Sequence, residues 1–278
     1  MTLLAVSMGF LRRLLLGSLL LLAGAGPVPV SGQEADSDSL LVFSKTNDYR
    51  HASIADGRAA LRALADDHGW EMKVTEDSTA FRRDRLMSFD VVVFLNTSGN
   101  VLGPRGQNAL RAFIEDGGGF VGVHAASDTE YDWPWYGRLV GAYFDGHPEV
   151  QEATVRVERQ SHPSTQMLPS KWQRRDEWYN FRSNPRDSVR VLLTLDESTY
   201  EGGTMGNDHP IAWCRSLKAG RAWYTAGGHT SEAYQDSLFR QHLLGGLQWA
   251  VGQKSSAAPD WFVVPATALL PFRSLTDP

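Results

Sequence analysis

The chain has 278 residues, of which 42% are hydrophobic and 21% are charged, as in an ordinary globular protein. Its formal net charge of -5 provides no basic surface for nucleic acid, which excludes a nucleic-acid partner. The single cysteine, Cys214, excludes an intrachain disulfide, and its apolar neighbours favour a buried structural thiol over a nucleophile.

Residues 1–25 are predicted to be a secretory signal peptide. Two arginines precede the apolar run 14–23, and small residues follow that run. The run is short for a transmembrane helix, so we expect a periplasmic or secreted protein with no stable membrane span after cleavage; an uncleaved anchor is the alternative. Residues 26–38 are interpreted as a linker and residues 254–278 as a tail, which leaves a single domain at residues 39–253.

Strands and helices are predicted to alternate through the first half of this domain. Apolar periodicity predicts helices at residues 54–68 and 104–116, and strands at residues 40–43, 70–74, 91–95 and 120–123. Ser53 is the predicted N-cap of the first helix, and Gly69 ends that helix. The alternation predicts an α/β fold with a doubly wound, mostly parallel sheet flanked by helices.

The pattern changes after the strand at 120–123. Residues 125–150 are irregular but rich in aromatic side chains, which predicts an ordered functional loop rather than disorder. The remaining predicted elements are a closing amphipathic helix at residues 234–251 and strands at residues 152–157, 189–195, 211–214 and 221–225.

Polar residues follow three of the predicted strands, at positions 47–51, 96–99 and 124–128. In an open α/β sheet the carboxyl ends of the strands share one edge, so these segments are expected to face one crevice. His124 directly follows its strand, where related architectures present a nucleophile on a sharp turn. An imidazole at that position favours a base or a metal ligand, and the structural alternative is a histidine satisfied within the turn.

Several segments in order resemble one known family. They are residues 48–54 (DYRHASI), 117–124 (GGGFVGVH), 176–179 (DEWY), 220–230 (GRAWYTAGGHT) and 239–250 (FRQHLLGGLQWA). Together they span about residues 40–252 and resemble the ThuA-like, trehalose-utilisation family, whose fold is that of class I glutamine amidotransferases and is flavodoxin-like. The resemblance implies a role in carbohydrate metabolism, with a disaccharide or a 3-keto-glycoside as the small-molecule partner.

The same resemblance argues against glutaminase activity. His124 occupies the position where true class I amidotransferases carry a catalytic cysteine. His229 matches their later histidine, but the nearby carboxylate, Glu232, is displaced. Hydrolysis of glutamine through a thioester requires a thiolate, so we expect an acid/base hydrolase, lyase or isomerase instead. The alternatives are a non-catalytic sugar-binding protein and a metal-dependent hydrolase.

Roles are assigned to the crevice residues on this basis. The predicted catalytic residues are His124, Asp128, Glu177 and His229. The predicted substrate-binding residues are Tyr49, His51, Asn96, Trp133, Trp135, His147 and Tyr179, of which the two tryptophans offer flat faces for a sugar or form a lid that packs on the sheet. The candidate ligands of a divalent metal such as Zn²⁺ are His51, His124, His147 and His229, although no compact motif supports a metal over a metal-free acid/base pair. His68, His162 and His242 are interpreted as structural or exposed, and oligomeric state is left open.

Overall fold

A computed structural model describes residues 37–252. The predicted signal peptide, most of the predicted linker and the predicted tail lie outside the described residues. Nine strands form one sheet in the order β2-β1-β3-β4-β11-β10-β9-β6-β7. Its parallel part contains β1 (Ser39–Phe43), β2 (Glu71–Thr75), β3 (Val91–Leu95), β4 (Gly119–Val123) and β11 (Gly220–Thr225). The antiparallel extension contains β10 (His209–Leu217), β9 (Arg190–Asp196), β6 (Gln151–Val157) and β7 (Lys171–Asp176).

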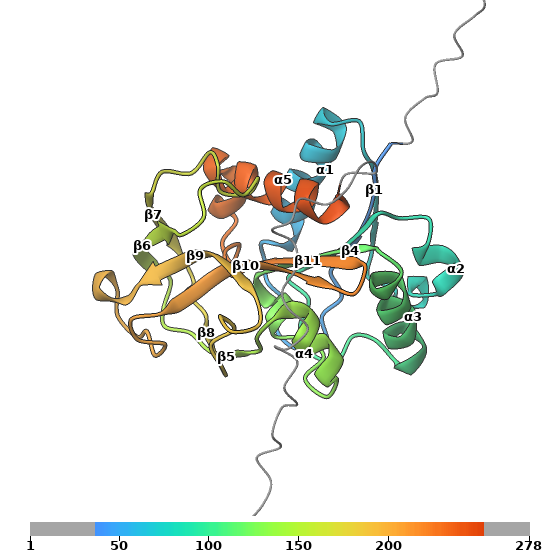
Figure 1. The fold of residues 1–278 in the computed structure, drawn as a ribbon, viewed down its shortest axis with the longest axis horizontal. Coiled ribbons are helices and arrows are strands. Elements are labelled where there is room, and N and C mark those ends of the chain that lie inside the picture. Colours follow the sequence, from blue (N-terminus) through green and yellow to red (C-terminus); the bar gives the residue numbers. More distant parts are fainter. Residues whose placement is uncertain (1–36, 253–278) are drawn as a thin grey trace, which may run out of the picture. The chain divides into compact units, whose positions relative to one another are not determined.

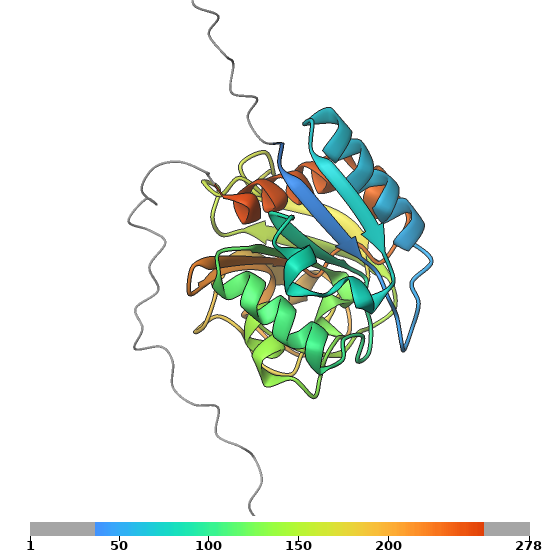
Figure 2. The ribbon, with the colours of Figure 1, turned by 90° about the vertical axis from the view of Figure 1, so that its right-hand side faces the viewer.

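Helices cover both faces of the sheet (Figures 1 and 2). One face carries α1 (Ile54–Asp67) and α5 (Ser237–Val251), and the other carries α3 (Pro104–Glu115) and α4 (Pro134–Val140). The shorter elements are α2 (Arg83–Leu86), the paired strands β5 (Phe144–Gly146) and β8 (Asn180–Phe181), and four 3₁₀ turns, η1 (Ser78–Ala80), η2 (His124–Ser127), η3 (Glu197–Thr199) and η4 (Glu232–Gln235). Among the described residues, none of these helices has the length and apolarity that crossing a membrane requires.

The expected doubly wound α/β fold is confirmed, and the predicted elements of the first half agree with the structure to within about two residues. Ser53 is the N-cap residue of α1, as predicted, but its side chain makes no cap bond, because its hydroxyl donates to the carbonyl of Gly228 instead. Sequence periodicity also missed α4 and β7. The buried face of β7 is Trp172, Arg174 and Asp176, and two charged residues on that face hide the apolar alternation by which strands are recognised.

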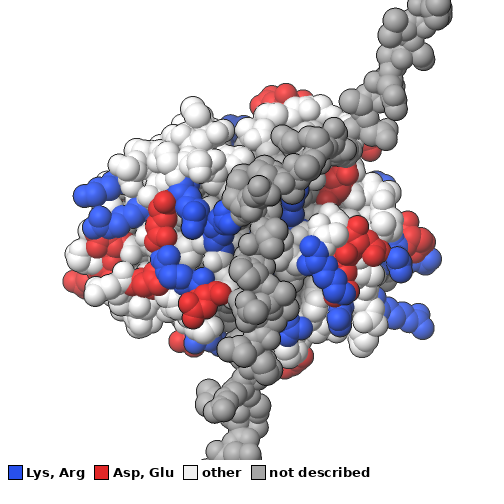
Figure 3. All heavy atoms as spheres, in the orientation of Figure 1, with Lys and Arg blue, Asp and Glu red and all other residues white. Residues whose placement is uncertain are grey.

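Charged side chains of both signs share the face of the described residues that Figure 3 draws. On the face drawn in Figure 3, blue and red side chains are interspersed over the described part of the chain. Several of them form exposed ion pairs, such as Arg82 with Asp84 and Arg83 with Asp116. Exposed pairs of this kind contribute little to stability, so the core must hold the fold.

His242 on α5 is buried in that core as a neutral imidazole. Its Nδ1–H donates to the carbonyl of Ser164 (2.8 Å), and its Nε2 accepts from the Thr225 hydroxyl (3.2 Å). Burial lowers its pKa to about 3, although the Ser164 bond opposes that shift. The unfolded chain therefore binds a proton here below the ordinary histidine pKa near 6.5, while the folded chain does not.

This difference makes stability fall as the pH falls. For His242 alone we expect the free energy of unfolding to drop by about 2 kcal/mol between pH 7 and pH 5. Urea unfolding of the wild type and of His242→Gln at pH 7 and pH 5 measures this change in the free energy of unfolding. The variant lacks the titrating imidazole and should therefore lose less stability at pH 5 than the wild type does. An equal pH 7 to pH 5 difference in both proteins would contradict the prediction.

Candidate active site

The turn after β4 presents His124 at the carboxyl edge of the sheet. Its backbone has a φ of 50°, a left-handed conformation that costs a non-glycine residue about 1 kcal/mol. The turn is tight, because a Cβ at Gly122 would lie 3.0 Å from the Tyr224 ring and 3.2 Å from the Cβ of Ala126. The predicted sharp strand-to-helix turn is therefore present, and its strain lies where functional residues often sit.

The hydrogen bonds of His124 fix the orientation of its ring. Its Nδ1 lies 2.7 Å from the carbonyl oxygen of Ala226, which can only accept, so Nδ1 carries a proton. In the neutral ring, Nε2 is then a bare lone pair, 3.2 Å from His229 Nδ1 and 3.4 Å from Glu177 Oε2. The face of the ring lies on Tyr179, with the centroids 4.1 Å apart.

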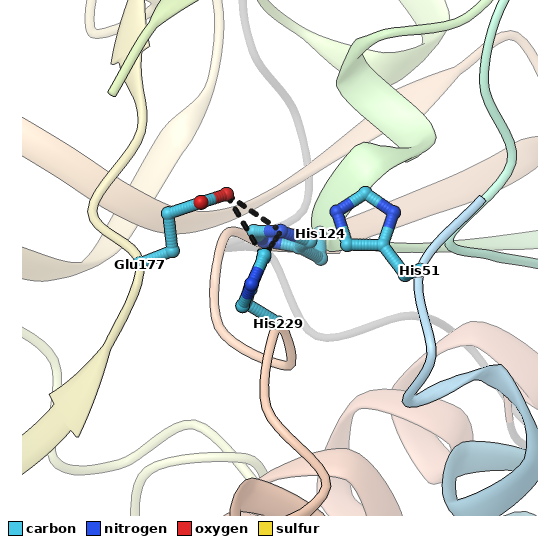
Figure 4. A group of neighbouring side chains, drawn as sticks. All are labelled: His51, His124, Glu177 and His229. Atoms are coloured by element: carbon cyan, nitrogen blue, oxygen red, sulfur yellow. Dashed lines mark hydrogen bonds and ion pairs between the residues drawn. The ribbon is translucent and has the colours of Figure 1, made fainter. Parts of the chain in front are cut away.

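Glu177 and His229 reach His124 from two other strands, β7 and β11. All three of these strands run in the same direction, so the residues that follow them emerge at the same edge of the sheet. Glu177 Oε2 lies 2.9 Å from His229 Nδ1, while its Oε1 lies 3.1 Å from Nδ1 of the half-exposed His147. Figure 4 shows the carboxylate and the imidazoles converging.

His51, in the loop between β1 and α1, completes the cluster. It is buried, and its ring centroid lies 4.8 Å from that of His124 and 5.0 Å from that of His229. One ligand atom from each of His51, His124, Glu177 and His229 lies within 4.8 Å of the others, so these four side chains could hold a metal ion. Three of the four predicted metal ligands belong to this group. Glu177, predicted as catalytic, takes the place of His147.

The ionisation of the cluster follows from its packing. Burial, with the neighbouring His124 and His229, lowers the pKa of His51 to about 2 and keeps it neutral. Burial alone would raise the pKa of Glu177, but the hydrogen bond from His229 and the electrostatic effect of the neighbouring imidazoles outweigh that effect and lower it. Burial alone would lower the pKa of His229, but its bond to Glu177 outweighs that effect and raises it. The site therefore combines the anionic carboxylate of Glu177, the readily protonated imidazole of His229 and the neutral imidazole of His51.

Asp176 holds the His229 turn and was missed by sequence reasoning. Its carboxylate is fully buried, accepts from the backbone N–H of Gly228 (2.9 Å) and of His229 (3.0 Å), and pairs with Arg174 at 2.6 Å. The signal in the sequence was the family-like segment 176–179 (DEWY), in which Asp176 directly precedes Glu177. Asp176 therefore positions Glu177 and His229 together, from the same end of β7.

Asn96 serves the same turn rather than an open binding surface. It was predicted to bind substrate, but it is fully buried, and its amide donates to Ser53 Oγ (3.0 Å) and to the carbonyl of Gly228 (3.2 Å). That carbonyl also accepts from Ser53 (3.3 Å) and from the Tyr234 hydroxyl (3.0 Å). These bonds fix the backbone beside His229.

The structure does not bring the two predicted sugar-binding tryptophans to the cluster. Trp133 and Trp135 stack on each other at 4.9 Å and pack with Tyr136 against the core, and Trp135 is only 6% exposed. Their positions agree with the alternative role given to them in the sequence analysis, in which both tryptophans pack onto the sheet. The exposed aromatic beside the cluster is Tyr49, which is 63% exposed and lies 4.8 Å from the His51 ring.

The remaining candidates lie as follows. Asp128, four residues after His124, accepts a hydrogen bond from the Tyr131 hydroxyl (2.6 Å), and burial raises the pKa of its carboxyl.

Cys214 is buried, and burial raises the pKa of its thiol to about 12, in agreement with a structural role. Glu232 is exposed on η4, so the carboxylate that contacts His229 is that of Glu177.

The ThuA family, described as trehalose utilisation, matches residues 39–250. The chain belongs to the ThuA family. All four residues of the cluster lie inside the ThuA match, and at the family level the match relates the chain to carbohydrate. A search of curated proteins finds no match.

Solved structures share the ThuA fold. A ThuA-like protein from Bacteroides uniformis superposes with a TM-score of 0.68 at 27% identity, over 79% of this chain and 94% of its own. A ThuA-like protein from Parabacteroides merdae gives a TM-score of 0.66 at 21% identity, over 81% and 94%. A cytoplasmic protein from Salmonella typhimurium gives 0.53 at 12% identity, over 77% and 98%. The last two likenesses concern the fold alone.

Proposed function

We propose that this ThuA protein is an exported enzyme of carbohydrate metabolism that performs acid/base chemistry on a disaccharide or its 3-keto form. One observation carries the proposal: His124, Glu177 and His229 follow three different strands, yet they meet within 3.4 Å on a strained turn. The family relationship supports the substrate class. The predicted signal peptide supports a periplasmic or secreted location.

The contacts of the cluster support a proton-transfer mechanism. A C–H bond next to a ketone yields to an imidazole base when the carbonyl oxygen receives a hydrogen bond at the same time. Nε2 of His124 is the base with an available lone pair, and His229, paired with Glu177, is the donor. In a 3-keto-glycoside the resulting enol can expel the glycosidic oxygen from the next carbon, with a proton from the same pair. Glutamine hydrolysis is not proposed, because the cluster contains no thiol.

A substrate panel tests the proposal. The folded protein is incubated with several disaccharides and with their 3-keto forms, and products are followed by chromatography. We expect cleavage or isomerisation of a keto form. Saturable binding of a sugar without any product would instead identify a non-catalytic sugar-binding protein.

Tyr49 is the residue that we expect to hold the sugar ring. Because its exposed face lies beside His51, Tyr49→Ala should raise KM about tenfold, equivalent to one aromatic stacking contact, and change kcat little. Met167→Ala is the matched control, since Met167 is equally exposed at 62% and belongs to a different loop. Steady-state kinetics of both variants and of the wild type give the KM and kcat values to be compared. Equal KM values would remove Tyr49 from the binding site.

A further inference from the structure

We propose that His51, His124, Glu177 and His229 bind one divalent transition-metal ion of the zinc class. The inference rests on the proposed function and deepens it: with the ion bound, Nε2 of His124 and the His229–Glu177 pair would serve as its ligands, and the ion in place of the free imidazole would activate the sugar. It is carried by three features of the described residues: the spacing of the ligand atoms, the tautomer of His124 and the groups that hold the ligands in place.

The spacing fits a metal polyhedron. Ligand atoms at 2.0–2.1 Å from a tetrahedral Zn²⁺ lie about 3.3 Å from one another. Nε2 of His124, Nδ1 of His229 and Oε2 of Glu177 are separated by 3.2, 2.9 and 3.4 Å, so they form one nearly regular triangular face. The fourth ligand atom, from His51, lies within 4.8 Å of the other three, and Figure 4 shows one ring nitrogen of His51 turned toward His124.

The His124 tautomer leaves an electrostatic problem that a cation would solve. In its neutral form, with the proton on Nδ1, His124 would direct a lone pair at a carboxylate oxygen only 3.4 Å away. Two acceptors that face each other repel, and the single Nδ1–H of His229 cannot bridge both well. A positive ion between the three atoms would satisfy all of them.

The surroundings resemble the outer shell of metal sites. A ligating histidine usually donates its other ring N–H to a carbonyl or carboxylate, as His124 does to Ala226. Asp176 fixes the backbone of His229, and His147 contacts the Glu177 oxygen that is directed away from the triangle. These partners orient three ligands before any ion binds, which lowers the cost of binding.

The ligand types select the ion. Three imidazoles and one carboxylate suit Zn²⁺, Co²⁺ or Fe²⁺, whereas Mg²⁺ prefers oxygen ligands. A bound ion would act as a Lewis acid on a sugar carbonyl or lower the pKa of a bound water.

Metal titration of the folded full chain, purified without a histidine tag and stripped with a chelator, tests the inference. We expect one equivalent of Zn²⁺ by calorimetry and a visible Co²⁺ spectrum of tetrahedral type, with no response to Mg²⁺. Glu177→Gln and His229→Gln should each weaken Zn²⁺ binding about a hundredfold or more, and His51→Gln about tenfold. His68→Gln, which alters an exposed histidine outside the cluster, should bind as the wild type does.

Circular dichroism of every variant separates lost binding from lost folding. Folded wild-type protein that takes up less than a tenth of an equivalent of Zn²⁺ would overturn the inference, as would Glu177→Gln and His229→Gln variants that bind like the wild type. Turnover by stripped protein that binds no ion would remove the metal and leave the proposed function. Stoichiometric Zn²⁺ binding without turnover of any sugar would support the metal site and contradict the proposed function.

Discussion

The variant His124→Asn is expected to lose at least about a thousandfold in kcat/KM. The imidazole of His124, on the turn after β4, contacts both Glu177 and His229, and the variant removes it. Asparagine is the replacement of choice, since it tolerates the left-handed backbone at φ 50° better than other side chains do. The loss should appear in kcat, because the base acts in the chemical step rather than in binding. Steady-state kinetics on the substrate identified by the panel measure it.

Two controls keep this result interpretable. Urea unfolding should show that His124→Asn stays folded. His68→Gln, an exposed histidine on the far end of α1, should retain full activity. If folded His124→Asn protein kept more than about a tenth of the wild-type rate, the cluster would not be the catalytic centre.

The variant Asp176→Asn is expected to lower the free energy of unfolding by about 3 kcal/mol, because it leaves Arg174 buried without its charged partner. Arg174 cannot easily reach water, since its guanidinium lies between the rings of Trp172 (4.6 Å) and Phe239 (4.4 Å). The same change weakens the bonds that hold the backbone of His229, so activity and Zn²⁺ affinity should fall together with stability.

Urea unfolding of Asp176→Asn beside Asp84→Asn provides the comparison. Asp84 also pairs with an arginine, but that pair is exposed, and its loss should leave stability unchanged. Kinetics at a temperature where Asp176→Asn is fully folded then separate positioning from stability. Equal stability of the two variants, or an unchanged activity of folded Asp176→Asn, would contradict this account of the turn.

Sequence reasoning predicted most of the parallel half of the fold. Strands such as Val91–Leu95 are uniformly apolar, and helices such as Ile54–Asp67 have one buried stripe. Buried elements of these two kinds have apolar patterns that can be recognised in the sequence. The rule that ligands bind at the carboxyl ends of parallel strands predicts from the sequence that His51 and His124 face one crevice. The match to the ThuA family confirms the assignment that the motifs supported.

The aromatic residues and the antiparallel strands were less accessible. Composition alone could not separate Trp135, which is buried in the core, from Tyr49, which is exposed beside the cluster, because aromatic side chains serve both purposes. The sequence also could not show that Asn96 is buried, because a polar residue at a strand end is suited both to binding a ligand and to linking neighbouring turns, as its bonds to Ser53 and Gly228 do.

The order of residues by itself determined the parallel strands, the helices beside them and the turn that carries His124, because each of these depends on local periodicity. Only the tertiary structure decided that Glu177 meets His229. Strand β7 lies at the far end of the sheet order, its buried face includes Arg174 and Asp176, and its end contacts the turn after β11 through Asp176. Contacts between the ends of strands so distant in sheet order depend on the arrangement of the whole sheet. A local sequence pattern carries no information about that arrangement.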